Sequence, residues 1–302
     1  MAATAAEPRP AELPLPGGRP GATVRLHPLL TGRFVGPKAR YLREEGRMAW
    51  RRALGYGVPR REWLQVPVPA FLVEHPAAGP ILVDTGLHPS VAAKPNENFG
   101  RVTLMVFKDL RMDPEEAAPA QLWARGIGPV DVKFVVMTHL HVDHASAISE
   151  FPEAAFLVSR AEWEAAASGG QLQGYVRRQF DHAFDYRLLD FEGPATESFA
   201  GFGRSFDLFG DGSVRCVYTP GHTLGHLSVV VRLREREVLL TGDAIYLRQN
   251  LDEMRLSHRT ADDHLSERSL REMRRYVTET PGALVVPSHD WEVWQRLDPV
   301  YD

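Results

Sequence analysis

The chain has 302 residues, of which 44% are hydrophobic and 25% are charged, as is typical of a globular protein. Its formal net charge of −4 gives no electrostatic reason to expect nucleic acid or an anionic membrane as a partner. No apolar run approaches the ~20 residues of a membrane span. The lone cysteine, Cys216, excludes an intrachain disulfide and fits a reducing compartment, so we expect a cytoplasmic protein.

The first part of the chain divides by composition. Residues 1–22 are rich in Pro, Ala and Gly and lack the apolar core of a secretion signal, which predicts a mobile tail. Residues 23–302 are expected to form a single domain. Within it, 33–61 is basic and has apolar residues at roughly helical spacing, namely Tyr41, Leu42, Met48, Ala49 and Ala53. This pattern predicts a short amphipathic helix that packs on the body, caps a site or forms a homodimer contact.

The rest of the chain alternates between short β-type runs and helical segments. Strands are predicted at 66–74, 80–86, 133–139, 154–159, 213–220, 226–233, 237–243 and 283–290. Helices are predicted at 114–126, 160–167 and 262–278. This alternation indicates an α/β protein in which helices cover sheets.

The stretch MTHLHVDHA, residues 137–145, places three histidines and an aspartate within six positions. In an extended backbone, side chains two apart point the same way, so His139 and His141 can reach one cation together. Asp143 and His144 are adjacent, and a turn after the strand could aim them at a second ion.

Further candidate ligands follow other predicted strands, in loops that contain small residues. His222 lies in YTPGHTLGH, Asp243 in LLTGDAIY and His289 in VVPSHDW. Strand ends are where α/β proteins build their sites. Together with the cluster at 139–144 this makes seven candidates, too many for one tetrahedral ion but suited to two ions that share a carboxylate.

The motifs THLHVDHA, TPGHTLGH, TGD and SHD, in this order, resemble the metallo-β-lactamase superfamily from about Val66 to His289. The resemblance implies a four-layer αββα sandwich with a dinuclear metal site at the sheet edge. It implies one ion held by His139, His141 and His222, and a second held by Asp143, His144 and His289. Asp243 is then the bridging ligand, and Asp84 in GPILVDTG supports the site without binding metal.

Within the superfamily, the pattern is most similar to the N-acyl-homoserine lactonase branch. True β-lactamases lack the bridging carboxylate, and the di-iron members usually carry Glu at the position of His141. Tyr246, three residues after Asp243, matches a tyrosine that points at the substrate carbonyl in the lactonases. A tyrosine after a strand can also be a half-buried packing residue.

The expected function is therefore opening of a lactone ring, as in quorum quenching, by attack of hydroxide. Two divalent transition-metal ions, zinc with iron, cobalt or manganese as alternatives, lower the pKa of water and polarise the carbonyl. Asp143 and Tyr246 are the predicted catalytic residues, as proton carrier and hydrogen-bond donor. The expected partner is a small lactone or ester.

Three alternatives stay open at this point. A glyoxalase II-like thioester hydrolase, or a broader esterase or phosphoesterase, would use the same ligands. A non-enzymatic scaffold that binds metal for structure is the third, although a structural zinc needs only four ligands.

Overall fold

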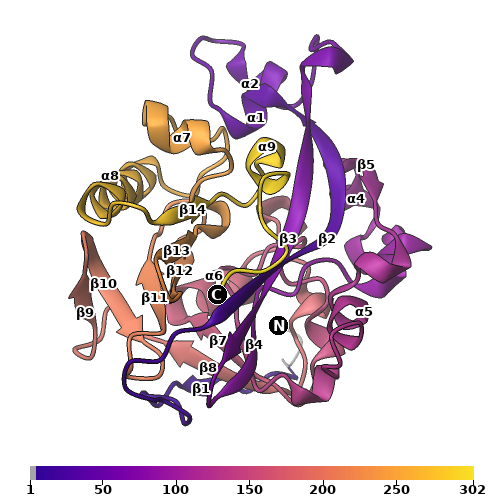
Figure 1. The fold of residues 1–302 in the computed structure, drawn as a ribbon. Helices are drawn as coiled ribbons and strands as arrows, with labels where there is room; N and C mark the ends of the chain where they lie inside the picture. The colour runs from indigo at the N-terminus through magenta and orange to yellow at the C-terminus, as the bar shows by residue number, and fades with distance from the viewer. Residues whose placement is uncertain (1–4) are drawn as a thin grey trace.

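The computed structural model describes residues 5–302 and consists of two β-sheets packed face to face with helices on their outer surfaces (Figure 1). In order across the first sheet, the strands are β1 (Arg9–Pro10), β8 (Asp185–Leu189), β7 (Ala155–Ser159), β6 (Phe134–Val136), β4 (Gly79–Val83), β3 (Trp63–His75), β2 (Arg25–Pro37) and β5 (Lys108–Arg111). Those of the second are β14 (Leu284–Val286), β13 (Glu237–Leu240), β12 (Leu227–Arg232), β11 (Val214–Tyr218), β10 (Phe202–Asp207) and β9 (Glu197–Phe199).

The alternation of side chains along each strand produces the layers. In β4, Ile81 and Val83 enter the core between the two sheets, where Cys216 of β11 is also buried. Leu82 points the other way and packs in the cluster that contains Trp163. Successive strand residues face opposite sides of a sheet. A strand that is apolar throughout can therefore be buried on both faces, here by the second sheet on one side and by helices on the other.

Helices cover both outer faces. The first sheet is covered by α5 (Ala118–Trp123) and α6 (Arg160–Ser168), and the second by α8 (Asp263–Glu279). From α8, residues three apart such as Leu270, Met273 and Tyr276 face the sheet. The shorter helices are α1 (Lys38–Tyr41), α2 (Ala49–Ala53), α3 (Pro95–Phe99), α4 (Arg101–Leu104), α7 (Arg248–Glu253) and α9 (Trp291–Trp294). The αββα sandwich expected from the motifs is confirmed.

The segment 33–61 differs from the single amphipathic helix that its spacing predicts. Its first five residues complete the long strand β2, which the sequence analysis did not predict, and two short helices follow, α1 and α2. Between these helices the backbone of Gly46 has φ +109°, a conformation that residues with a side chain disfavour. In Figure 1, α1 and α2 lie at the top of the view, beside the upper ends of β2 and β3.

The described part of the expected tail, 5–22, also differs from the prediction of a mobile segment. β1 pairs in parallel with β8, and the amide of Leu15 donates to the carbonyl of Leu208 at 2.7 Å. The side chains of Ala6 and Leu15 are buried. Residues 1–4 of this expected tail lie outside the described residues. The Pro, Ala and Gly content suggested mobility, but a few buried apolar side chains and backbone hydrogen bonds are enough to hold an irregular segment against the domain.

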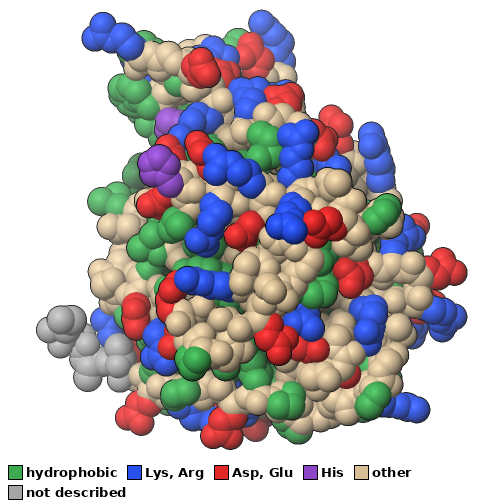
Figure 2. All heavy atoms as spheres, turned by 90° about the vertical axis from the view of Figure 1, so that its left-hand side faces the viewer, with side chains coloured by type: hydrophobic (Ala, Val, Ile, Leu, Met, Phe, Trp, Pro, Cys, Tyr) green, Lys and Arg blue, Asp and Glu red, His purple; other side chains and the backbone are tan. Residues whose placement is uncertain are grey.

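On the face shown in Figure 2, Lys and Arg side chains are interspersed with Asp and Glu, as the small net charge implies. Within residues 5–302, no helix combines the length and the apolar character needed to cross a membrane.

Candidate metal centre

The seven candidate ligands lie on loops at the carboxyl ends of strands. His139, His141, Asp143 and His144 follow β6, His222 follows β11, Asp243 follows β13 and His289 follows β14. All seven are buried. The folded chain thus brings together in one place side chains that are as much as 150 residues apart in the sequence.

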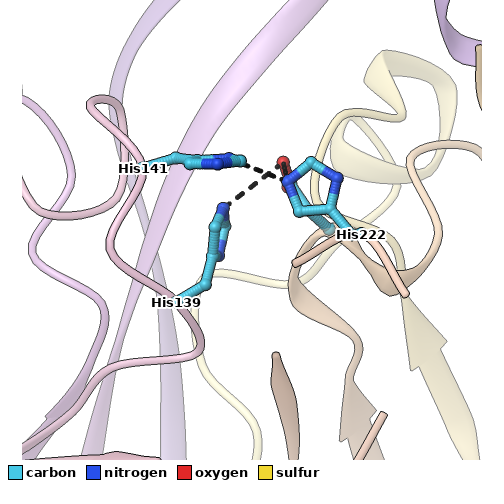
Figure 3. A group of neighbouring side chains, drawn as sticks. His139, His141 and His222 are labelled. Atoms are coloured by element: carbon cyan, nitrogen blue, oxygen red, sulfur yellow. Dashed lines mark hydrogen bonds and ion pairs between the residues drawn. The ribbon is translucent and has the colours of Figure 1, made fainter. Parts of the chain in front are cut away.

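The first group consists of His139, His141, His222 and Asp243, whose candidate ligand atoms all lie within 4.8 Å of one another. Figure 3 shows the three imidazoles turned toward one another. His222 Nε2 is 2.9 Å from His141 Nδ1 and 3.3 Å from Asp243 Oδ2. His139 Nε2 is 3.6 Å from the same carboxylate oxygen. Three imidazoles and one carboxylate match the donor set of a transition-metal site.

The second group consists of Asp143, His144 and His289, also with ligand atoms within 4.8 Å of one another. His289 Nε2 lies 3.5 Å from Asp143 Oδ2, and His144 Nε2 lies 4.0 Å from it. The other oxygen of Asp243, Oδ1, is 3.1 Å from His144 Nε2 and 3.2 Å from His289 Nε2. One oxygen of Asp243 therefore faces each group, which is the geometry of a bridging carboxylate.

Two observations show that these residues fit metal ions. First, His139 Nε2, His144 Nε2 and Asp243 Oδ1 are buried polar atoms without a hydrogen-bond partner, and buried polar atoms normally have one. Second, in the first group burial lowers the pKa of His139 and His141 well below the usual range and that of His222 to about 4, which favours the neutral imidazole that binds a cation. The two groups together fit a dinuclear site.

Asp243 is held as a carboxylate within this cluster. Burial alone would raise its pKa, but the imidazoles of His289, His144 and His222 outweigh burial and hold the pKa well below its usual range. The buried ring of His226 accepts a hydrogen bond from the Asp243 amide at 2.9 Å, and its other nitrogen lies 2.9 Å from the Thr219 hydroxyl. His226 thus holds the backbone of Asp243 in place.

Asp84 forms hydrogen bonds that hold His144 of the second group in place. Its carboxylate accepts hydrogen bonds from the amide and the hydroxyl of Thr138, both at 2.8 Å, and Nδ1 of His144 lies 2.7 Å from it. The backbone of Asp84 has φ +57°, which is unusual for a residue other than glycine. These bonds fix His144 with Nε2 directed at Asp243, the arrangement expected of residues that orient a metal ligand.

A cavity of about 220 Å³ opens onto the ligands. Asp143, His222, Asp243 and His289 line its floor, and the Tyr246 hydroxyl lies 3.2 Å from His222 Nδ1. The remaining wall is largely apolar and comes from separate segments, through Phe34, Tyr41, Ala53, Leu54, Val102, Val106, Phe107, Val142 and Leu172. The seven candidate ligands and Tyr246 therefore share one site.

Several residues of the site are absent from the motifs. Tyr41 lies against Tyr246 and His289, with ring centroids 5.5 Å and 6.3 Å away. Arg259 lines the cavity mouth and donates to the carbonyl of Leu172 at 2.5 Å. Their only sequence signal is position in the basic segment 33–61 or in a loop before a helix. The first of these positions allows a cap over a site without singling out Tyr41, and the second gives no indication of a site residue.

Comparison with known proteins gives consistent results. Residues 63–289 match the model of the metallo-beta-lactamase superfamily. N-acyl homoserine lactonase AttM of Azorhizobium caulinodans is 37% identical over 237 residues, 76% of this chain and 84% of that protein. AttM of Agrobacterium fabrum is 35% identical over 240 residues, 77% of this chain and 85% of that protein.

A solved structure of an N-acyl homoserine lactone hydrolase, with the product N-hexanoyl-L-homoserine bound at its catalytic metal centre, has a TM-score of 0.73. The alignment covers 93% of this chain and all of that one, at 24% identity, and so shows a common fold. The two-sheet sandwich with two facing groups of His and Asp defines a protein with a dinuclear metal site. The chain belongs to the metallo-β-lactamase superfamily.

Proposed function

We propose that this protein is a metal-dependent lactonase that hydrolyses the ring ester of N-acyl-homoserine lactones to N-acyl-homoserines. The observation that carries the proposal is the position of the Tyr246 hydroxyl, at the edge of the ligand groups and in a cavity with an apolar wall. Such a cavity suits a small polar ring joined to an acyl chain. The relatives named N-acyl homoserine lactonase support this substrate class.

The residues that would hold the metals are those of the two groups, with Asp243 shared between them. Two divalent cations at such a site lower the pKa of water, polarise an ester carbonyl and offset the negative charge that develops on its oxygen. Zinc suits the five imidazoles and two carboxylates, and iron, cobalt and manganese suit them as well. We propose zinc as the metal.

Tyr246 would donate a hydrogen bond to the ring carbonyl oxygen. Burial raises the pKa of its hydroxyl well above the usual range, and the charge of Asp243 adds to this effect. The hydroxyl therefore keeps its proton at neutral pH. A donor held in place strengthens its bond as the oxygen gains charge, so it stabilises the transition state more than the bound substrate.

Asp143 would carry a proton between two oxygens. The attacking water adds its oxygen to the carbonyl carbon and loses a proton, the bond from that carbon to the ring oxygen breaks, and Asp143 delivers a proton to the ring oxygen. The products are a carboxylic acid and a hydroxyl on one open chain, which together contain all atoms of lactone and water, and the acid then releases its proton to solvent at neutral pH. Asp143 lines the cavity that would hold the ester, where a carboxyl can exchange a proton with the reacting oxygens.

The segment 33–61 would act as a cap over the acyl group. It contributes Phe34, Arg40, Tyr41, Ala53 and Leu54 to the cavity wall, which supports the cap over a purely structural role. A homodimer contact is the second interpretation. The same segment exposes Met48, Trp50 and Tyr56 by more than half, and sedimentation velocity would show whether the protein forms a dimer. We also propose a cytoplasmic location, in keeping with the lone, buried Cys216.

The proposal is tested by a hydrolysis panel on metal-loaded protein, with an acyl-homoserine lactone, a glutathione thioester and a phosphodiester at equal concentrations. We expect kcat/KM for the lactone to exceed the other two by at least about tenfold, since only the lactone matches both ring site and acyl wall. A preference for the thioester would instead establish a glyoxalase II-like hydrolase. Two bound ions with no hydrolysis of any ester would establish a metal-binding scaffold.

A further inference from the structure

Besides Asp84, another buried carboxylate, that of Glu162, lies next to the loops that carry the candidate ligands. The proposed mechanism does not use it. Glu162 is in the first turn of α6, where its amide donates to the hydroxyl of the N-cap residue Ser159 at 3.1 Å. Its side chain is fully buried. A carboxylate is costly to bury unless hydrogen-bond donors surround it, so its neighbours indicate why it is there.

The donors to Glu162 come from three loops. Oε1 accepts from the amide of Leu140 at 2.9 Å and from the hydroxyl of Tyr175 at 3.1 Å. Oε2 accepts from the hydroxyl of Thr223. Gly225 packs so closely that an added Cβ would lie 1.9 Å from the Glu162 amide nitrogen. One carboxylate therefore ties together the loops at 139–144, 170–176 and 222–226.

Each of these donors adjoins a ligand of the first group. Leu140 lies between His139 and His141 in the chain, and Thr223 follows His222 directly. Tyr175 pairs with His141 in an isolated β-bridge, and the two ring centroids are 5.0 Å apart. Glu162 thus contacts the backbone or the neighbour of every histidine in the first group. Asp84 is the carboxylate that contacts a ligand of the second group, His144, and it also bonds to Thr138, whose hydroxyl lies 3.1 Å from His139 Nδ1.

The charge of Glu162 is met by hydrogen bonds. Burial raises the pKa of its carboxyl, and bonds from the Thr223 hydroxyl, the Leu140 amide, the Tyr175 hydroxyl and the Gly225 amide oppose that rise. A carboxylate has about four lone-pair sites on two oxygens, enough for four donors. A glutamine of the same shape has one acceptor oxygen, and its amide would turn two N–H groups toward donors.

We propose that Glu162 is a positioning residue that fixes the three histidines of the first group so that they converge on one metal ion. The inference rests on the proposed metal site but does not depend on the substrate. Residues that orient ligands cost about 10–100-fold in metal affinity when they are changed. Loss of the Glu162 carboxylate should therefore weaken one of two bound ions and leave the other in place.

The test measures metal binding by competition with a chromophoric chelator, with Zn²⁺ as the probe, on wild type and Glu162→Gln. We expect the wild type to bind two ions tightly. We expect Glu162→Gln to bind one of them about 10–100-fold more weakly. The visible spectrum of the Co²⁺-loaded variant should change, because the geometry of three imidazole ligands changes. Glu164→Gln, on the same helix but exposed, is the matched control and should behave as the wild type.

The outcomes separate positioning from a structural role. A Glu162→Gln protein with a lower melting temperature but both metal affinities unchanged would overturn the proposal. If that variant does not fold, Tyr175→Phe and Thr223→Val each remove one donor and keep the carboxylate. Unchanged affinity in both would likewise overturn it.

The variant Asp84→Asn tests whether Glu162 acts on the first group of ligands. If Glu162 and Asp84 act on different groups, the double variant should lose affinity for both ions, because effects at independent sites add. Weakening of the same single ion in both single variants and in the double variant would overturn the assignment. Wild-type protein that binds no metal would overturn this inference and the proposed dinuclear site together.

Discussion

The hydroxyl of Tyr246 distinguishes a lactonase from an unspecified dinuclear hydrolase. Tyr246→Phe removes it and keeps the ring contacts with Tyr41 and His289, whose centroids are 5.5 Å and 5.2 Å away. We expect kcat on an acyl-homoserine lactone to fall about 10–100-fold with metal content unchanged. This is at or below the range for one oxyanion donor, because the cations share the charge. Turnover equal to wild type on every lactone tried would make Tyr246 a packing residue.

Asp143 is expected to matter more for turnover than for folding. Asp143→Asn keeps the shape of the side chain but removes its ability to accept and deliver a proton. We expect kcat to fall by about 10²–10⁴, the contribution of a general acid–base group. Thermal unfolding and elemental analysis of the same sample would show whether the fold and both ions are retained. Near-normal turnover with both ions bound would remove Asp143 from the mechanism.

Among the elements, the loop at 170–176 is held against the metal centre by a glycine. Gly174 has φ +99°, and an added Cβ would lie 2.7 Å from Cδ2 of His141. Gly174→Ala should therefore displace His141 as well as strain the backbone. We expect the variant to lose metal affinity about tenfold or more, in line with other changes that disturb a ligand.

A matched control exists at Gly46, which has φ +109° with no atom within 4 Å of an added Cβ. Gly46→Ala should cost the same ~1–2 kcal/mol of backbone strain in the free energy of unfolding but leave metal binding unchanged. Metal titration and chemical unfolding of both variants separate the two effects. Equal metal affinity in Gly174→Ala and Gly46→Ala would show that the loop does not hold His141.

The mouth of the cavity carries exposed apolar side chains from three elements or loops. Leu54, Val102, Val106 and Leu172 all line the cavity and are all exposed, Leu172 by 82%. We call these four side chains the apolar collar. A long acyl chain would cover the collar, and the binding free energy would become more favourable by about 25 cal/mol for each Å² of apolar surface removed from water. We therefore predict higher kcat/KM for long than for short acyl chains.

Leu172→Asn should reduce this preference by lowering kcat/KM for a decanoyl lactone several-fold while a butanoyl lactone is unaffected. Val130→Asn is the control, because Val130 is exposed by 56% but does not line the cavity. A loss that is equal for both chain lengths would exclude the collar as the acyl site.

For the whole molecule, the metal centre should contribute strongly to stability. The ligands come from loops of both sheets and converge only in the folded state, so ions bind the native chain in preference to the unfolded chain. Each ion at a thousandfold excess over its Kd adds about 4 kcal/mol to the free energy of unfolding.

Removal of both ions with a chelator should therefore lower the melting temperature by roughly 10 °C or more. Calorimetry before and after chelation, with restoration by added Zn²⁺, tests this, and elemental analysis should find two ions per chain. An unchanged melting temperature in fully metal-free protein would show that the centre is not coupled to folding.

The sequence by itself determined the composition of the site. The candidate ligands lie in short motifs at strand ends. What metal binding requires of these motifs, such as alternate side chains on one face or a small residue before a ligand, can be recognised within a few consecutive residues. The same locality made eight strands predictable, namely β3, β4, β6, β7 and β11 to β14, because alternation and apolar runs are local patterns. The strands β1, β2, β5, β8, β9 and β10 were not predicted. The structure confirms the αββα arrangement and brings all seven candidate ligands together.

Only the tertiary structure decided how the site is supported and enclosed. The donors to Glu162 lie 13, 22 and 61 residues away in the chain, and no local pattern identifies such partners. Docking of the segment at 5–22 and the split of 33–61 into β2, α1 and α2 likewise depend on surfaces that exist only after the sheets have formed. The ligand residues are specified by local chemistry, whereas their orientation and the cavity wall depend on packing between distant segments.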